Sequence, residues 1–127
     1  MSKKNLVLVV DDEEDICTYL STMLEDIGYD VIIAKDGKTA LEIAKKQNPD
    51  LITLDISMPE HTGIKAYREM KSDEQLKKIP VCVITGVDNV NIYFKKLAGF
   101  PIPEAYFSKP VDLNELRKTI EELVPTR

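Results

Sequence analysis

Short, nearly continuous apolar runs that are rich in β-branched residues alternate along this chain with segments of helical periodicity. The runs are Leu6–Val10, Val31–Ala34, Leu51–Leu54, Val81–Ile84 and Ala105–Phe107. The first four lack a regular alternation of polar and apolar residues, which is typical of strands buried on both faces of a parallel sheet. The fifth run is weaker, and we assign it as a strand from its context.

Helical patterns fill the segments between these runs and after the last one. Apolar residues recur at helical spacing in five stripes, over Ile16–Ile27, Leu41–Ala44, Ile64–Met70, Val90–Leu97 and Leu113–Leu123. A strand followed by a helix, repeated five times, predicts a doubly wound α/β fold with a parallel sheet and helices on both of its faces. We expect a single domain over residues 1–127.

The charge balance limits the partners of such a domain. The chain has 17 basic and 22 acidic residues, a formal net charge of −5, whereas a surface that binds nucleic acid or an anionic membrane would be basic. No apolar run approaches the roughly 18 residues of a membrane span, and Leu6–Val10 is too short for a signal-peptide core. Cys17 and Cys82 match no zinc or redox spacing. We therefore expect a cytoplasmic domain that binds neither nucleic acid nor membrane directly.

Polar side chains lie at the ends of four of the predicted strands. They are Asp11 and Asp12 after the first strand, Asp55 after the third, Thr85 at the end of the fourth and Lys109 after the fifth. In a parallel sheet all strands end at the same edge, so these side chains would lie close together. Ligands of such sheets bind at this edge, beyond the carboxyl ends of the strands. Clustered carboxylates repel one another unless a cation joins them, and a few hard oxygen ligands suit Mg²⁺.

Asp55 is the candidate nucleophile of this edge, since an aspartate can accept a phosphoryl group as a covalent acyl phosphate. Lys109 and the metal would neutralise the transferring group, and Thr85 would donate its hydroxyl to a phosphoryl oxygen. Taken singly, each residue has a simpler interpretation: Asp11 or Asp12 as a helix N-cap, Asp55 as a turn residue, Thr85 as an ordinary strand residue and Lys109 as a solvated lysine. Their shared edge favours the joint functional interpretation.

The combined pattern resembles the CheY-like receiver domain of bacterial response regulators in two-component signalling. The matching segments are Val9–Glu13, Leu54–Pro59 with Gly63, Val83–Gly86 and Tyr106–Pro110. The resemblance covers essentially the whole chain, and it implies a flavodoxin-like (βα)5 fold with five parallel strands in the order 2-1-3-4-5.

The resemblance also implies a reaction. Asp55 would be the phosphoacceptor and would take its phosphoryl group from a histidine on a sensor histidine kinase or a histidine phosphotransfer protein. The cofactor would be Mg²⁺, held by Asp11, Asp12, Asp55 and the backbone carbonyl of Ser57. Lys109 resembles the lysine that contacts the phosphoryl group, and its bond to the following proline would be cis.

Two further residues would couple phosphorylation to a change in the surface that binds a partner. Thr85 resembles the switch hydroxyl and Tyr106 the switch aromatic of the family. Phosphorylation adds roughly −1.5 to −2 charges and would shift the population towards a state with an altered face, built by the fourth helix, fifth strand and fifth helix. The expected assembly is a monomer or a phosphorylation-linked dimer.

The segment Phe100–Glu104 departs from the family pattern. Its two prolines cannot continue a helix, so we expect an ordered loop before the last strand, longer than the family usually has. The loop would lie beside the expected output face, which predicts an atypical partner surface.

Three other functions fit the pattern less well. A Mg²⁺-dependent phosphohydrolase with an aspartyl nucleophile usually carries a second acid two residues later, where this chain has Ser57. A nucleotide-binding domain would have a glycine-rich phosphate loop after the first strand, which is absent. A constitutive interaction module would not need intact Asp55, Thr85 and Lys109. We therefore expect no conventional enzyme, but a receiver that catalyses only its own phosphorylation and dephosphorylation.

Overall fold

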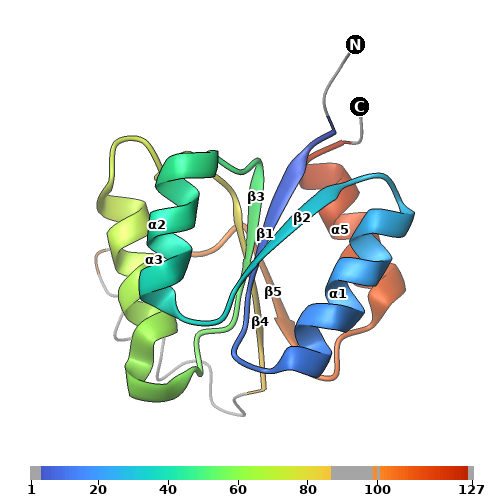
Figure 1. The fold of residues 1–127 in the computed structure, drawn as a ribbon, viewed down its shortest axis with the longest axis horizontal. Coiled ribbons are helices and arrows are strands. Elements are labelled where there is room, and N and C mark those ends of the chain that lie inside the picture. Colours follow the sequence, from blue (N-terminus) through green and yellow to red (C-terminus); the bar gives the residue numbers. More distant parts are fainter. Residues whose placement is uncertain (1–3, 87–98, 100, 126–127) are drawn as a thin grey trace.

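The computed structural model describes residues 4–86, 99 and 101–125. Five parallel strands form one sheet in the order β2-β1-β3-β4-β5 (Figure 1). The strands are β1 Leu6–Val10, β2 Asp30–Ala34, β3 Leu51–Leu54, β4 Val81–Thr85 and β5 Ala105–Ser108. The doubly wound fold and its strand order, expected from the sequence, are confirmed.

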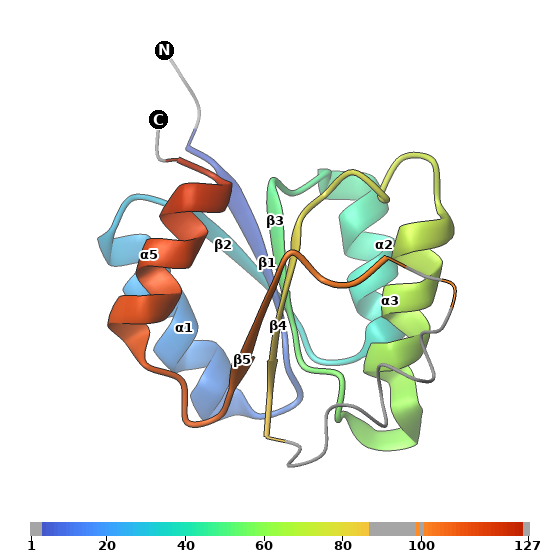
Figure 2. The same ribbon diagram turned by 180° about the vertical axis from the view of Figure 1, so that it is seen from behind.

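The helices lie on both sides of this sheet. Their bounds are α1 Glu14–Asp26, α2 Gly37–Gln47, the short 3-10 helix η1 Pro59–His61, α3 Thr62–Ser72 and α5 Leu113–Leu123. Helices α1 and α5 cover one face, and α2 and α3 cover the other, as the views from the front and from behind show (Figures 1 and 2). The expected helix over Val90–Leu97 lies outside the described residues. No helix in the described part of the chain combines the length and the apolar character needed to cross a bilayer.

Alternate residues of the central strands contribute to two separate cores. In β1, Val7 and Val9 pack with α1 and α5, whereas Leu8 and Val10 pack with α2 and α3. Because successive strand side chains point to opposite faces, a strand covered on both sides needs apolar residues at every position. This explains the continuous apolar runs of β1, β3 and β4, nearly all of whose residues are buried.

The expectation of burial on both faces is wrong for β2. Only Ala34 of this strand is buried, while Asp30 and Ile33 are exposed. The strand order explains the difference, because among the described strands β2 pairs only with β1 and is therefore an outermost strand, with no neighbouring strand on its other side. A continuous apolar run therefore does not by itself distinguish a central strand from an edge strand.

The backbone ladder continues past three of the strand ends and fixes the residues that follow. Asp55 N donates to Val10 O at 3.0 Å, Asp11 N to Ala34 O at 3.1 Å and Lys109 N to Thr85 O at 2.9 Å. Since all strands run in the same direction, these residues meet at one edge of the sheet, the lower edge in Figure 1.

The described part of the loop before β5 is ordered by contacts with α3. Tyr67 donates its hydroxyl to Pro101 O at 2.5 Å, and Lys71 forms an ion pair of 3.3 Å with Glu104. The side chain of Lys71 is only 2% exposed, and its ammonium also donates to Ile79 O. Glu104 in turn accepts from the backbone of β4 at 2.7 Å. The expected ordered loop is thus confirmed for residues 101–104, and Phe100 lies outside the described residues.

Glu104→Gln is expected to lower the free energy of unfolding by about 1–3 kcal/mol, because it leaves the buried ammonium of Lys71 without its counter-charge. Glu74→Gln is the matched control: its carboxylate also pairs with a lysine, Lys77, but is 89% exposed. This control should change the stability by less than about 0.5 kcal/mol. Urea unfolding at neutral pH measures both values, and equal effects would contradict a structural role for the buried pair.

Candidate functional site

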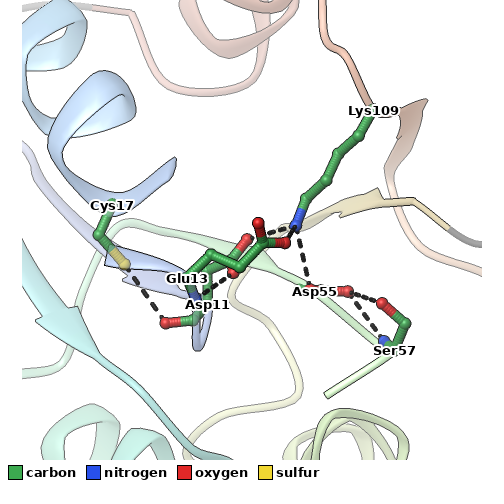
Figure 3. A network of polar contacts seen from close by, with 6 residues as sticks. All are labelled: Asp11, Glu13, Cys17, Asp55, Ser57 and Lys109. Carbon is green, nitrogen blue, oxygen red and sulfur yellow. Dashed lines mark hydrogen bonds and ion pairs between the residues drawn. The ribbon is translucent and has the colours of Figure 1, made fainter. Parts of the chain in front are cut away.

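Three carboxylates converge on one lysine at the carboxyl edge of the sheet. Lys109 Nζ lies 2.9 Å from Asp11 Oδ2, 3.0 Å from Glu13 Oε1 and 3.1 Å from Asp55 Oδ2 (Figure 3). The acids come from the ends of β1 and β3, and the lysine from the end of β5. The sequence prediction that Asp11, Asp55 and Lys109 share this edge is therefore confirmed, whereas their chemical roles stay predictions.

Asp55 is held at both of its oxygens. Oδ2 faces Lys109, and Oδ1 accepts two hydrogen bonds from Ser57, one from the backbone N–H at 2.8 Å and one from the hydroxyl at 2.6 Å. The side chain is only 3% exposed. Gly63 explains how α3 approaches this segment so closely, because a Cβ at residue 63 would lie 2.2 Å from the carbonyl oxygen of Asp55. The carboxylate is thus fixed in one orientation by its neighbours.

The donor set fits a hard divalent cation. Carboxylate oxygens of Asp11, Asp12, Glu13 and Asp55 all lie within 4.8 Å of one another. Oxygen ligands at this density suit Mg²⁺, which keeps several of its waters and needs few protein carboxylates. Asp12 and Glu13 are exposed, so the cluster is open to solvent on that side.

Burial and charge oppose each other in the cluster. Burial raises the pKa of Asp11 above its ordinary value, although hydrogen bonds from Lys109 and from the Glu13 N–H act in the other direction. Burial by itself would lower the pKa of Lys109, but its bonds to Asp11 and Glu13 and the charge of Asp55 outweigh burial and raise that pKa. These contacts therefore favour the charged form of Lys109 beside the buried carboxylates of Asp11 and Asp55.

The two expected switch residues occupy different environments. Thr85 is fully buried at the end of β4, and its carbonyl accepts from Lys109 N. Tyr106 is 39% exposed, and its hydroxyl lies 3.0 Å from the Ser108 hydroxyl on the same face of β5. Tyr106 is thus outside the carboxylate cluster, and the switch roles of both residues stay predictions.

Two of the simpler interpretations are wrong. Glu13 is the N-cap of α1, so neither Asp11 nor Asp12 is the cap; Asp11 Oδ1 instead accepts from Glu13 N at 2.9 Å. Lys109 is no solvated lysine, because its side chain is only 13% exposed. The Lys109–Pro110 bond is cis, as the family resemblance implies.

Sequence reasoning missed two contacts of the site. It did not pair Glu13 with Lys109, whereas the structure places the Glu13 carboxylate on that lysine. It expected only the backbone carbonyl of Ser57 to take part, whereas the Ser57 hydroxyl donates to Asp55. The position of Glu13, directly after two expected metal ligands, was the available signal. No sequence signal gave the rotamer of Ser57.

Lys109→Met is expected to destabilise the metal-free protein by about 1–3 kcal/mol, because it leaves the buried carboxylates of Asp11 and Asp55 uncompensated. Lys35→Met is the control, since Lys35 is 56% exposed and lies 4.0 Å from the acid it pairs with, Glu14. Its effect should stay below about 0.5 kcal/mol. Urea unfolding in a chelator distinguishes the two, and a Lys109→Met protein as stable as the wild type would refute the argument.

Comparison with known proteins places this arrangement in a family. The family model described as the response regulator receiver domain matches residues 7–121. The alkaline phosphatase synthesis transcriptional regulatory protein PhoP of Bacillus subtilis is 37% identical over 125 residues, which cover 98% of this chain and 49% of that protein. The chain thus spans about half the length of this relative, and the same share of a probable transcriptional regulator, ycf27, of Porphyridium aerugineum.

Two further matches each extend over nearly the whole of this chain and nearly the whole of the matched protein. The polar-differentiation response regulator DivK of Brucella ovis is 33% identical over 115 residues, or 91% of this chain and 92% of that protein. The solved structure of the chemotaxis response regulator CheY4 of Vibrio cholerae has a TM-score of 0.81 and 29% identity, and the match covers 96% of this chain and all of that one. With its sheet, its acidic edge and its lysine, the chain belongs to the response-regulator receiver family of two-component signalling.

Proposed function

We propose that this chain is a phosphorylatable receiver that accepts a phosphoryl group on Asp55 in a Mg²⁺-dependent reaction. The donor is a phosphohistidine on a sensor histidine kinase or a histidine phosphotransfer protein. The observation that carries the proposal is the placement of Lys109, whose ammonium joins Asp55 to Asp11 across the ends of three strands. Such an arrangement concentrates positive charge where a transferring phosphoryl group needs it.

The transfer is a substitution at phosphorus. One carboxylate oxygen of Asp55 forms a bond to the phosphorus while the phosphorus–nitrogen bond of the donor histidine breaks, and the leaving imidazole keeps the bonding electron pair. Asp55 suits this role because the two hydrogen bonds from Ser57 orient its carboxylate before the reaction. Lys109 neutralises the phosphoryl oxygens as a point charge.

The metal site of this proposal consists of Asp11, Asp12, Asp55 and the backbone carbonyl of Ser57. The clustering of acidic oxygens supports it. When bound, Mg²⁺ supplies charge neutralisation for the carboxylates and the phosphoryl oxygens. Asp11 and Asp55, both almost fully buried, would then have a divalent cation as their counter-charge in place of the ammonium of Lys109.

Phosphorylation is proposed to act through Thr85 and Tyr106. The added negative charge attracts the Thr85 hydroxyl, and Tyr106 is proposed to turn inward from its present exposed position. The responding surface is the one built by the fourth helix, β5 and α5. Pro101–Glu104, which is anchored to α3, borders β5 and gives this surface its own shape.

We extend the proposal to the location, the binding partners and the assembly of the chain. It acts as a single cytoplasmic receiver domain over residues 1–127, binds neither nucleic acid nor membrane directly, and is a monomer or a phosphorylation-linked dimer. It hydrolyses no external phosphate ester. The serine at position 57 supports this last point, because such a hydrolase has an acidic residue there as its general acid.

Incubation with Mg²⁺ and a small acyl phosphate is expected to add one phosphoryl group to the wild-type chain, detected by intact mass. Asp55→Asn should stay unmodified, because an amide has no nucleophilic carboxylate oxygen. Asp50→Asn is a control that keeps the nucleophile. An unmodified wild type, or equal modification of wild type and Asp55→Asn, would refute the proposal.

Asp12→Asn is expected to weaken Mg²⁺ binding by about tenfold or more, as measured by isothermal titration calorimetry, because it removes a ligand charge. Asp15→Asn removes the same charge from an exposed position on the first turn of α1. That control should change the affinity by less than about threefold, because Asp15 lies outside the carboxylate cluster and acts only through a solvent-screened charge. Similar affinities for both variants would exclude Asp12 from the metal site.

A further inference from the structure

Among the described residues that contact the Lys109 ammonium, Glu13 is the one that the proposed metal site and reaction do not use. It is the N-cap of α1 but makes no side-chain cap hydrogen bond. Its carboxylate instead accepts from Lys109 Nζ at 3.0 Å, although the side chain is 60% exposed. A favourable interaction with the helix dipole would explain an acid at this position. It does not explain why the acid reaches across to a lysine on the other side of the site (Figure 3).

The three contacts of Lys109 match the donor capacity of its ammonium. A lysine ammonium has three N–H donors, and the three acceptors are Asp11, Glu13 and Asp55. Asp11 and Asp55 are also proposed ligands of Mg²⁺, whereas Glu13 is not. A divalent cation and the ammonium therefore compete for two of these carboxylates and repel each other as like charges.

We infer that Glu13 is a positioning residue that keeps Lys109 beside the site while a divalent cation occupies Asp11 and Asp55. The inference rests on the proposed function and adds a residue to it. Glu13 contacts neither the phosphorus nor Asp55 and acts only through Lys109. Its side chain is 60% exposed, which leaves it room to move with the ammonium.

The physical benefit is a smaller ordering cost for a flexible side chain. Lysine carries its charge on a four-carbon stem with many rotamers, and an ammonium without an acceptor would turn towards solvent. One remaining acceptor at the rim of the site holds the ammonium close to where phosphoryl oxygens arrive. Lys109 then reaches the phosphoryl group without a search through its rotamers.

Glu13→Gln and Glu14→Gln form a matched pair for the test. Both remove one negative charge from neighbouring residues at the start of α1, but Glu14 is 82% exposed and reaches Lys35, not Lys109. The first measurement uses ¹⁵N-lysine NMR on unphosphorylated protein saturated with Mg²⁺. A slowly exchanging Lys109 ammonium signal is expected in the wild type and in Glu14→Gln, and its loss is expected in Glu13→Gln. An ammonium signal that is unchanged in Glu13→Gln would overturn the inference.

The second measurement is the rate of Asp55 modification by a small acyl phosphate at saturating Mg²⁺. Glu13→Gln is expected to react about two- to fivefold more slowly than Glu14→Gln, the range that an exposed ion pair supplies. In a Lys109→Gln background, Glu13→Gln should have no further effect. Equal rates for the two glutamine variants, or an undiminished effect without Lys109, would overturn the inference.

The experiment also separates the inference from its basis and from its main competitor. A wild-type chain that is not modified at all refutes the proposed function, whereas a reactive wild type with an unaffected Glu13→Gln variant refutes the role of Glu13 alone. Calorimetry with Mg²⁺ tests the competitor, in which Glu13 is itself a ligand of the cation. An affinity loss of about tenfold or more in Glu13→Gln, absent in Glu14→Gln, would favour that alternative and overturn the inference.

Discussion

The parallel direction of the five strands is the constraint on which the rest of the structure depends. Because every strand ends at the same edge, residues far apart in the sequence meet there: Asp11, Asp55 and Lys109 each continue the backbone ladder by one hydrogen bond beyond a strand end. Burial of the strands on the two cores fixes their register, since a shift by one residue would exchange the faces of every side chain. The stability of the sheet and the geometry of the acidic edge thus have the same origin.

Lys109 solves the electrostatic problem that this geometry creates. Asp11 and Asp55 are almost fully buried and lie close together, which would be unfavourable without a counter-charge. The ammonium provides that charge, and it comes from a third strand end, so the acids and the lysine stabilise one another only in the folded sheet. In the proposed function, a divalent cation would take over this role at the carboxylates, and the ammonium would pair with the phosphoryl oxygens instead.

A second ion pair shows how the same physics serves structure alone. Lys71 and Glu104 lie at the contact of α3 with the segment before β5, where the lysine is nearly inaccessible to solvent. Together with the Tyr67 hydroxyl, the pair anchors residues 101–104, a segment that contains two prolines. The sequence indicated an ordered loop there, but neither its anchor nor the burial of Lys71 could be predicted.

The sequence by itself determined the order of the strands and that Asp11, Asp55 and Lys109 meet where the strands end. Apolar runs and helical stripes report local burial, and parallel connection brings strand ends together whatever the details of packing. Only the tertiary structure decided how far β2 is exposed and which acid caps α1. It also decided where the side chains of Glu13 and Ser57 point. The physical reason is that these features depend on neighbours contributed by other elements. The most important of these neighbours is the ammonium of Lys109, which is too far from Glu13 in the sequence for a local pattern to reveal their contact.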